Sequence, residues 1–175
     1  MKSLTARTIV STTLLALATA AQADEKSVAG NARRFESLKQ LAGQWVEVAK
    51  DGKPSDKVVS SIRVTSAGTV VEETLFPGSD HEMVTMYHLD GDDLLLTHYC
   101  SLGNQPRLRA EPSDDAKRII FKFVGATNLK SEDEMHIHQA KFQLDDADHF
   151  HAEWTANKDG GECHQVVLDL VRKQK

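Results

Sequence analysis

The feature that most constrains the fold is the texture of the chain from Trp45 onward, where short runs rich in Val, Ile, Thr, Phe and Tyr alternate with turn-forming clusters. Runs of this length and composition are typical of β-strands. The clusters are Ser66-Ala67-Gly68, Asp90-Gly91-Asp92, Asp145-Asp146-Ala147-Asp148 and Asp159-Gly160-Gly161. No helix-length pattern separates the runs, so βαβ units with a parallel sheet are not expected.

These runs predict antiparallel strands. Their expected bounds are Gln44–Ala49, Lys57–Thr65, Thr69–Phe76, Met83–Leu89, Leu94–Cys100, Arg107–Ala110, Arg118–Val124, Glu134–Phe142, His149–Thr155 and Glu162–Val171. An up-and-down barrel or a sandwich accommodates so many short strands, and only the barrel leaves no unpaired edge. We therefore predict an all-β protein, an antiparallel up-and-down barrel of about eight to ten strands.

One helix is predicted before the strands, from Val28 to Leu41. Phe35, Leu38 and Leu41 recur at the spacing of one helical face. Gly43 follows and is a typical helix terminator.

The first 23 residues have the pattern of a secretory signal peptide. Lys2 and Arg7 precede an apolar stretch, Ile9 to Ala21, that is shorter than the ~18 residues a membrane span needs. Ala21-Gln22-Ala23 matches a signal-peptidase site. We expect residues 24–175 to form a single domain in the periplasm or outside the cell. No later apolar run is long enough for a transmembrane segment.

Removal of the signal peptide would take away two positive charges and no acid, so the net charge of −5 would become −7. Such a domain is not expected to bind nucleic acid or an anionic membrane surface. The basic pairs Arg33-Arg34 and Arg172-Lys173 are expected to be solvated near the chain ends. The sequence does not indicate an oligomeric state.

Two short segments carry a resemblance to a known family. Leu41-Ala42-Gly43-Gln44-Trp45 is similar to the Gly-x-Trp entry strand of the lipocalin-like, or calycin, barrels, and residues 168–173 resemble their last strand. The resemblance implies that Arg172 stacks on Trp45 by a cation–π contact and closes one barrel end. It also implies a small-molecule ligand in the barrel cup.

Two further comparisons bear on this resemblance. Residues 73–107 also resemble a segment of small exported bacterial proteins. The haem-binding barrels of the nitrobindin type carry further glycines after the tryptophan, and Val46-Glu47-Val48 stands here instead. The resemblance therefore does not imply haem.

Side-chain alternation assigns faces within each predicted strand. In the last strand the more apolar face carries Leu168, Leu170 and Arg172, so it is predicted to point inward, and His164 shares it. His98 shares a face with Leu94 and Leu96. His149 and His151 lie opposite Trp154 and are exposed if Trp154 is in the core.

A binding barrel needs a few polar groups converging on an apolar pocket. The candidates around one barrel mouth are His98, Tyr99, Asn104, Gln105, Arg107, Arg109, His136 and His138. Arg107 and Arg109 share a face and could bind a carboxylate by forked hydrogen bonds. The alternative is that both are ordinary surface arginines.

Two other functions stay open. The histidines could hold a metal or a haem, although no metal-binding spacing is present. His98, Glu82 and His138 could serve a proton-transfer enzyme, but no catalytic residue and no cofactor can be assigned. Glu72 and Glu73 are expected to be solvated.

The two cysteines, Cys100 and Cys163, suggest a disulfide because an exported protein meets an oxidising compartment. The alternative is that they act as thiolate ligands beside His98 and His164. A disulfide would exclude that alternative.

Overall fold

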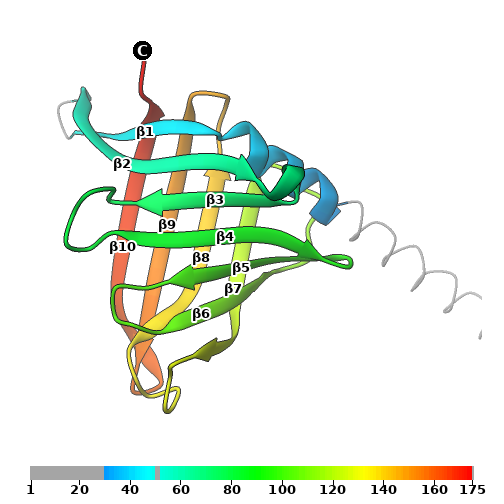
Figure 1. Cartoon of the computed structure of the whole chain (residues 1–175), viewed down its shortest axis with the longest axis vertical. Helices are drawn as coiled ribbons and strands as arrows, with labels where there is room; N and C mark the ends of the chain where they lie inside the picture. Colours follow the sequence, from blue (N-terminus) through cyan, green and yellow to red (C-terminus); the bar gives the residue numbers. More distant parts are fainter. Residues whose placement is uncertain (1–29, 50–51, 175) are drawn as a thin grey trace, which may run out of the picture.

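A computed structural model describes residues 30–49 and 52–174. The predicted signal peptide lies outside the described residues. Within them the chain forms a closed antiparallel barrel (Figure 1). Its strands are β1 (Gly43–Val48), β2 (Pro54–Thr65), β3 (Val70–Leu75), β4 (Met83–Asp90), β5 (Asp93–Tyr99), β6 (Gln105–Ala110), β7 (Arg118–Thr127), β8 (His136–Leu144), β9 (His149–Lys158) and β10 (Gly161–Arg172).

Every strand pairs with its neighbours in the sequence, and β1 pairs with β10 to close the ring. Each of the ten predicted strands corresponds to one observed strand. The all-β up-and-down barrel is therefore confirmed, and its closed topology is compatible with a calycin-like barrel.

The helix covers one end of the barrel. It includes residues 30–40 and buries Phe35 and Leu38, as the predicted apolar stripe requires. Asn31 Nδ2 donates to the carbonyl of Asp92 in the β4–β5 turn, at 2.7 Å. Figure 1 shows the helix beside this end, which we call the helix end. None of the described residues forms a helix long and apolar enough to cross a membrane.

The opposite end, which we call the far end, carries the β1–β2, β3–β4, β5–β6, β7–β8 and β9–β10 connections. This division follows because all strand pairs are antiparallel and successive connections must then alternate between the two ends.

Arg34 and Arg172 correct the expectation of solvated basic pairs. Arg34 is fully buried, donates to the carbonyl of Glu111 at 2.8 Å and also donates to Asn31 Oδ1. Burial lowers the pKa of Arg34. Both arginines hold the helix end together because guanidinium groups satisfy carbonyl groups that the helix and the loops leave unpaired.

The predicted Trp45–Arg172 pair is confirmed. The Arg172 guanidinium lies 4.4 Å from the centroid of the buried Trp45 ring. It also donates to the carbonyls of Gln40, Ala42 and Ala147. Glycine is favoured at position 43, because its φ is +145° and because a Cβ there would lie 2.6 Å from Arg172 Nη1 and displace the guanidinium.

Aromatic rings fill the middle of the barrel. Tyr87 of β4 contacts Phe142 of β8 at 6.0 Å between centroids, and Trp45 of β1 contacts Phe150 of β9 at 4.6 Å. These strands are not neighbours, so the rings must meet across the interior. The interior is therefore a packed core, and space for a ligand is restricted to its ends.

The predicted disulfide is wrong. Cys100 and Cys163 are not bonded. Cys100 directly follows β5 and Cys163 lies in β10, and these strands stand on opposite walls of the ring, with four strands between them on either side. Although both residues lie toward the far end, a disulfide needs their Cα atoms within about 7 Å. The sequence shows the even count but not this separation.

Two free thiols of different reactivity are therefore expected. Cys163 is exposed, whereas Cys100 is half-buried and burial raises the pKa of its thiol. Since the thiolate is the reacting form, iodoacetamide should modify Cys163 first, and dithiothreitol should leave the Tm unchanged. Mass spectrometry of timed samples checks this, with Cys163→Ser as the control. If the mass of the denatured, unreduced protein is lower by two hydrogen atoms, the two cysteines do form a disulfide and this prediction is wrong.

Candidate functional site: the His98 cavity

A small apolar cavity opens into the barrel at the far end. Its volume is about 50 Å³. Leu75 ends β3, while Met83 begins β4 and Ile137 lies near the start of β8, which places the cavity at the far end. We call it the His98 cavity. Its lining residues are Leu75, Phe76, Met83, His98, Ile137, Trp154, Val166 and Leu168.

The cavity runs from the protein surface to the core. Phe76, Met83, Ile137 and Val166 are partly exposed, and they pack against the buried core residues. Phe76 has φ +53°, in the left-handed region that a bulky side chain rarely adopts. Its N–H donates to the carbonyl of Val59 at 2.7 Å, which holds this conformation. The mouth therefore has an apolar rim.

His98 is the one ionisable residue that lines the cavity. It is 1% exposed, and its ring lies 5.0 Å from the ring of Trp154 in β9. Its Nδ1 shares a 2.9 Å hydrogen bond with Thr85 Oγ1. Its Nε2 is buried and has no hydrogen-bond partner among the described residues, and the same is true of Trp154 Nε1. Buried polar atoms rarely lack a hydrogen-bond partner, so each of these two atoms is expected to have one that the described residues do not supply.

Burial controls the charge of His98. It lowers the pKa of the imidazole to about 4, because a charged ring is poorly solvated in an apolar interior. At neutral pH the ring is therefore uncharged, with a proton on one nitrogen and a lone pair on the other.

A buried carboxyl group lies deeper in the barrel. Glu73 is 3% exposed, and it accepts hydrogen bonds from Ser60 Oγ at 2.6 Å and from Tyr87 Oη at 2.5 Å. Burial raises the pKa of Glu73, and the two hydrogen bonds oppose that rise. Burial, together with Glu73, also raises the pKa of Tyr87, which stays neutral. A gap of about 10 Å³ adjoins Glu73 and Tyr87.

Three of the sequence-predicted binding residues line a different hollow. Gln105, Arg107 and Arg109 border a groove of about 420 Å³ on the outer wall of β5, β6 and β7. Arg109 pairs with Asp93 at 3.2 Å, and both side chains are about half exposed. Exposed pairs of this kind contribute little. Arg107 and Arg109 are both exposed. They therefore face solvent on the outer wall, away from His98.

The other predicted residues also separate. Tyr99 is exposed, whereas Asn104 is buried and donates to the carbonyl of Met135 at 2.8 Å. His136 and His138 lie 3.3 Å apart, Nε2 to Nδ1. His138 stacks on Phe123, and the His136 ring lies tilted against the same ring. The eight predicted residues thus occupy several places at the far end and outer wall rather than one mouth.

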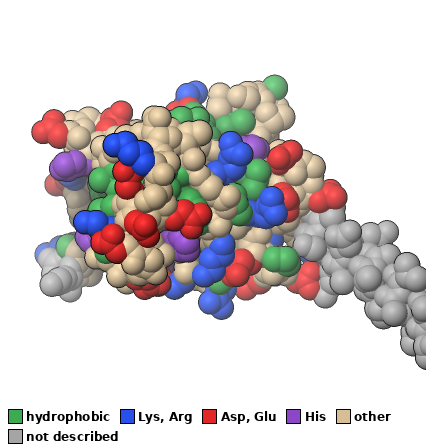
Figure 2. Space-filling view, turned by 90° about the horizontal axis from the view of Figure 1, so that it is seen from below, with side chains coloured by type: hydrophobic (Ala, Val, Ile, Leu, Met, Phe, Trp, Pro, Cys, Tyr) green, Lys and Arg blue, Asp and Glu red, His purple; other side chains and the backbone are tan. Residues whose placement is uncertain are grey.

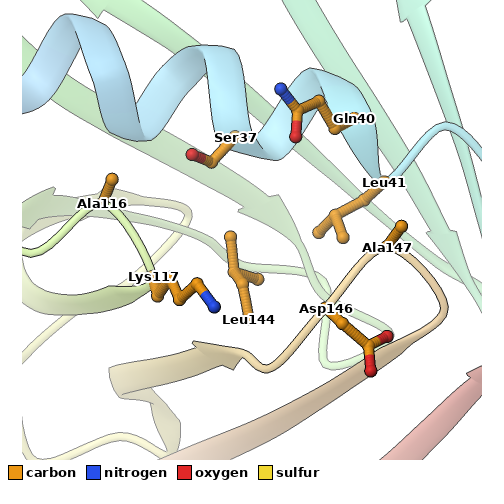
Figure 3. A pocket seen from close by; sticks show the side chains of 8 residues that line it. All are labelled: Ser37, Gln40, Leu41, Ala116, Lys117, Leu144, Asp146 and Ala147. Carbon is orange, nitrogen blue, oxygen red and sulfur yellow. The ribbon is translucent and has the colours of Figure 1, made fainter.

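A third hollow, of about 300 Å³, lies at the helix end (Figure 3). Leu144 lies at its centre with Leu41 turned toward it, and Asp146 is turned away. Lys117 Nζ already donates to the carbonyl of Asp145 at 3.0 Å, and Asp146 is bonded to His149. Lys117 and Asp146 therefore have partners within the protein, whereas His98 Nε2 has none among the described residues.

The histidines do not assemble a metal site within the described ranges. No group of three or more His, Cys, Asp and Glu side chains there could hold a metal ion. His149 is exposed, and the part-exposed His151 contacts Asp169 at 2.6 Å and Glu153 at 3.4 Å. These acidic contacts raise the pKa of His151.

The chain matches no protein-family model, and no curated protein is similar to it. The site must therefore be interpreted from its own geometry.

Two sequence expectations about buried and exposed side chains were wrong. His164 is exposed. It pairs with the buried Ala156 in the register of Val166 and Leu168, so it lies on their face of β10 but nearer the far end. Glu73 is buried rather than solvated. Its position between Val71 and Leu75 on one face of β3 is the signal that could have identified it. Thr85, Tyr87 and Trp154 were not predicted as site residues.

Proposed function

We propose that this protein is an exported lipocalin-like barrel that binds a small, mainly apolar molecule in the His98 cavity. The observation that carries the proposal is His98, which lines a cavity whose other lining residues are apolar or aromatic and whose buried Nε2 has no hydrogen-bond partner among the described residues. Ligand sites combine an apolar lining with a few oriented polar groups in this way. The signal-peptide pattern of residues 1–23 supports a periplasmic or extracellular location.

The size of the cavity limits the ligand. A volume of about 50 Å³ is well below the ~150 Å³ of an engineered cavity that holds benzene. Only a slim group can enter, and the rest of the molecule would lie on the rim of Phe76, Met83, Ile137 and Val166. A slender chain with a polar end meets both conditions.

The surroundings favour an uncharged ligand. None of the described residues that line the cavity is cationic, since His98 is neutral with a pKa of about 4. Figure 2 shows that acidic and basic side chains are interspersed with apolar ones on the face seen there, rather than gathered into a patch of one sign. The same low pKa makes His98 a weak base, which favours binding over proton transfer.

Hexan-1-ol is a suitable probe. We expect calorimetry to show binding to the wild type, and binding weaker by about tenfold in His98→Leu because one buried hydrogen bond is lost. Leu168→Phe should abolish binding by filling the cavity.

His81→Leu is the matched control, since His81 is exposed in the β3–β4 connection. Its affinity should equal that of the wild type. The proposal fails if the wild type binds no hexan-1-ol up to the solubility limit, or if Leu168→Phe and the wild type bind it equally.

A further inference from the structure

The groove of about 420 Å³ on the outer wall of β5, β6 and β7 follows from a gap in the outward side chains. Thr97, Arg107 and Gly125 lie side by side across the three strands. A Cβ built at Gly125 would meet no atom of the described residues within 4 Å. The register between β6 and β7 shifts at this point, so Val124 is an extra residue in β7, and its side chain is exposed. Arg107 therefore lies beside open space.

Two cationic side chains face each other on the outer wall of β6 and β7. Arg109 pairs directly with Lys122 across these strands, and both side chains are exposed. Like charges in directly opposite positions repel. Arg109 has an ion pair with Asp93 at 3.2 Å, whereas Lys122 Nζ donates to the uncharged amide oxygen of Gln139 at 3.1 Å. One of the two positive charges is thus not neutralised by an ion pair among the described residues.

Arg107 adds a third positive charge, in the open part of the groove. It is exposed, and its guanidinium has no ion-pair or hydrogen-bond partner among the described residues. Asp90 is the one acidic residue among the described residues that line the groove. It pairs across β4 and β5 with Asp93, which places it at the Arg109 end of the groove. All five N–H donors of the Arg107 guanidinium are therefore available, in a planar fork that fits a carboxylate.

We propose that this groove binds the carboxylate of a small anionic molecule, held by forked hydrogen bonds from the Arg107 guanidinium. Thr97 lies beside Arg107, and its hydroxyl group can donate a further hydrogen bond. Val124 and Ala126 supply apolar surface in the same groove, on which a ring or a chain can lie. The site is separate from the His98 cavity, so this inference does not depend on the proposed function.

Benzoate is a suitable probe because its ring is too wide for the His98 cavity. The volume of that cavity, about 50 Å³, is well below the ~150 Å³ of a cavity that holds benzene. NMR titration of the ¹⁵N-labelled protein follows the backbone amides of Thr97 and Gly125. We expect benzoate to shift both signals in a saturable way, and the neutral benzamide to bind at least about fivefold more weakly. Added sodium chloride should weaken benzoate binding, since salt screens exposed charges.

Arg107→Gln removes the guanidinium and keeps a polar side chain at this exposed position. We expect it to weaken benzoate binding about fivefold and to leave benzamide binding unchanged. Arg63→Gln is the matched control, because Arg63 is an exposed arginine in β2 whose ion pair is with Glu72. It should bind benzoate as the wild type does.

Three results would overturn this inference. Benzoate could leave the amide signals of Thr97 and Gly125 unchanged, or benzamide could bind as tightly as benzoate. The third is an equal affinity for benzoate in Arg107→Gln and Arg63→Gln, which would show that Arg107 does not hold the carboxylate. None of these results changes the expected binding of hexan-1-ol in the His98 cavity, so the two proposals fail separately.

Discussion

Arg172→Met is expected to lower the free energy of unfolding by about 3 kcal/mol. The guanidinium lies over the buried Trp45 ring at 4.4 Å and is only 23% exposed. It bridges the C-terminal end of the helix and the β8–β9 connection, since it donates to carbonyls of both and to Asp148. Methionine preserves the apolar length of the side chain but leaves these carbonyls without their donor.

Urea unfolding followed by circular dichroism measures this loss. Arg63→Met is the matched control, because Arg63 is 63% exposed and its ion pair with Glu72 lies at the surface. Such pairs contribute about 0–1 kcal/mol. Equal losses for the two variants would show that the Trp45–Arg172 contact does not stabilise the closed end of the barrel.

The second large effect that we expect is a loss of protein stability at acidic pH, caused by His98. The pKa of His98 is 6.5 before folding and about 4 in the folded protein. Above pH 6.5 the ring is neutral in both states and contributes no pH dependence. Between that pH and about 4 the unfolded chain binds a proton that the folded protein does not, so stability falls as pH falls. The loss from His98 is about 3 kcal/mol across that range.

Glu73 acts in the opposite direction. Burial raises the pKa of its carboxyl group, so the folded protein binds that proton at a higher pH than the unfolded chain, and stability rises as pH falls. The two effects overlap in the measured stability of the wild type. A difference between the wild type and a His98 variant removes the Glu73 contribution.

We therefore expect the stability of the wild type relative to His98→Gln to decrease steadily from about pH 7 to about pH 4. Urea titrations at a series of pH values check this. His81→Gln, a substitution at an exposed position, controls for the loss of one histidine. A stability difference between wild type and His98→Gln that does not change with pH would mean that His98 is not buried as a neutral ring.

The strands could be predicted from the sequence because local chemistry specifies them. Turn residues such as Gly91 mark where each strand ends. Side-chain alternation predicted that His98 shares a face with Leu94 and Leu96, and all three residues are buried. The contact between Trp45 and Arg172 was implied by the resemblance of two short segments, and β1 and β10 pair directly at these two residues.

The features of the structure that could not be predicted depend on how the strands are arranged around the closed barrel. The distance between Cys100 and Cys163 is set by how many strands separate β5 from β10. His164 lies on the same face of β10 as Val166 and Leu168, and its exposure follows from its place near the far end of the barrel. The interior is filled because rings from non-neighbouring strands meet there, as Tyr87 and Phe142 do. A ligand cup expected from fold resemblance is thus reduced to a small cavity at one end.

The central claim is that a hydroxyl-bearing apolar molecule binds beside His98. Crystals soaked in 6-bromohexan-1-ol test it most directly, because the bromine gives an anomalous signal at one end of the molecule. We expect the hydroxyl oxygen within hydrogen-bond distance of His98 Nε2 and the bromine at the apolar rim of Phe76 and Val166. Bromine found only elsewhere on the protein, above an undisturbed His98 cavity, would contradict the account.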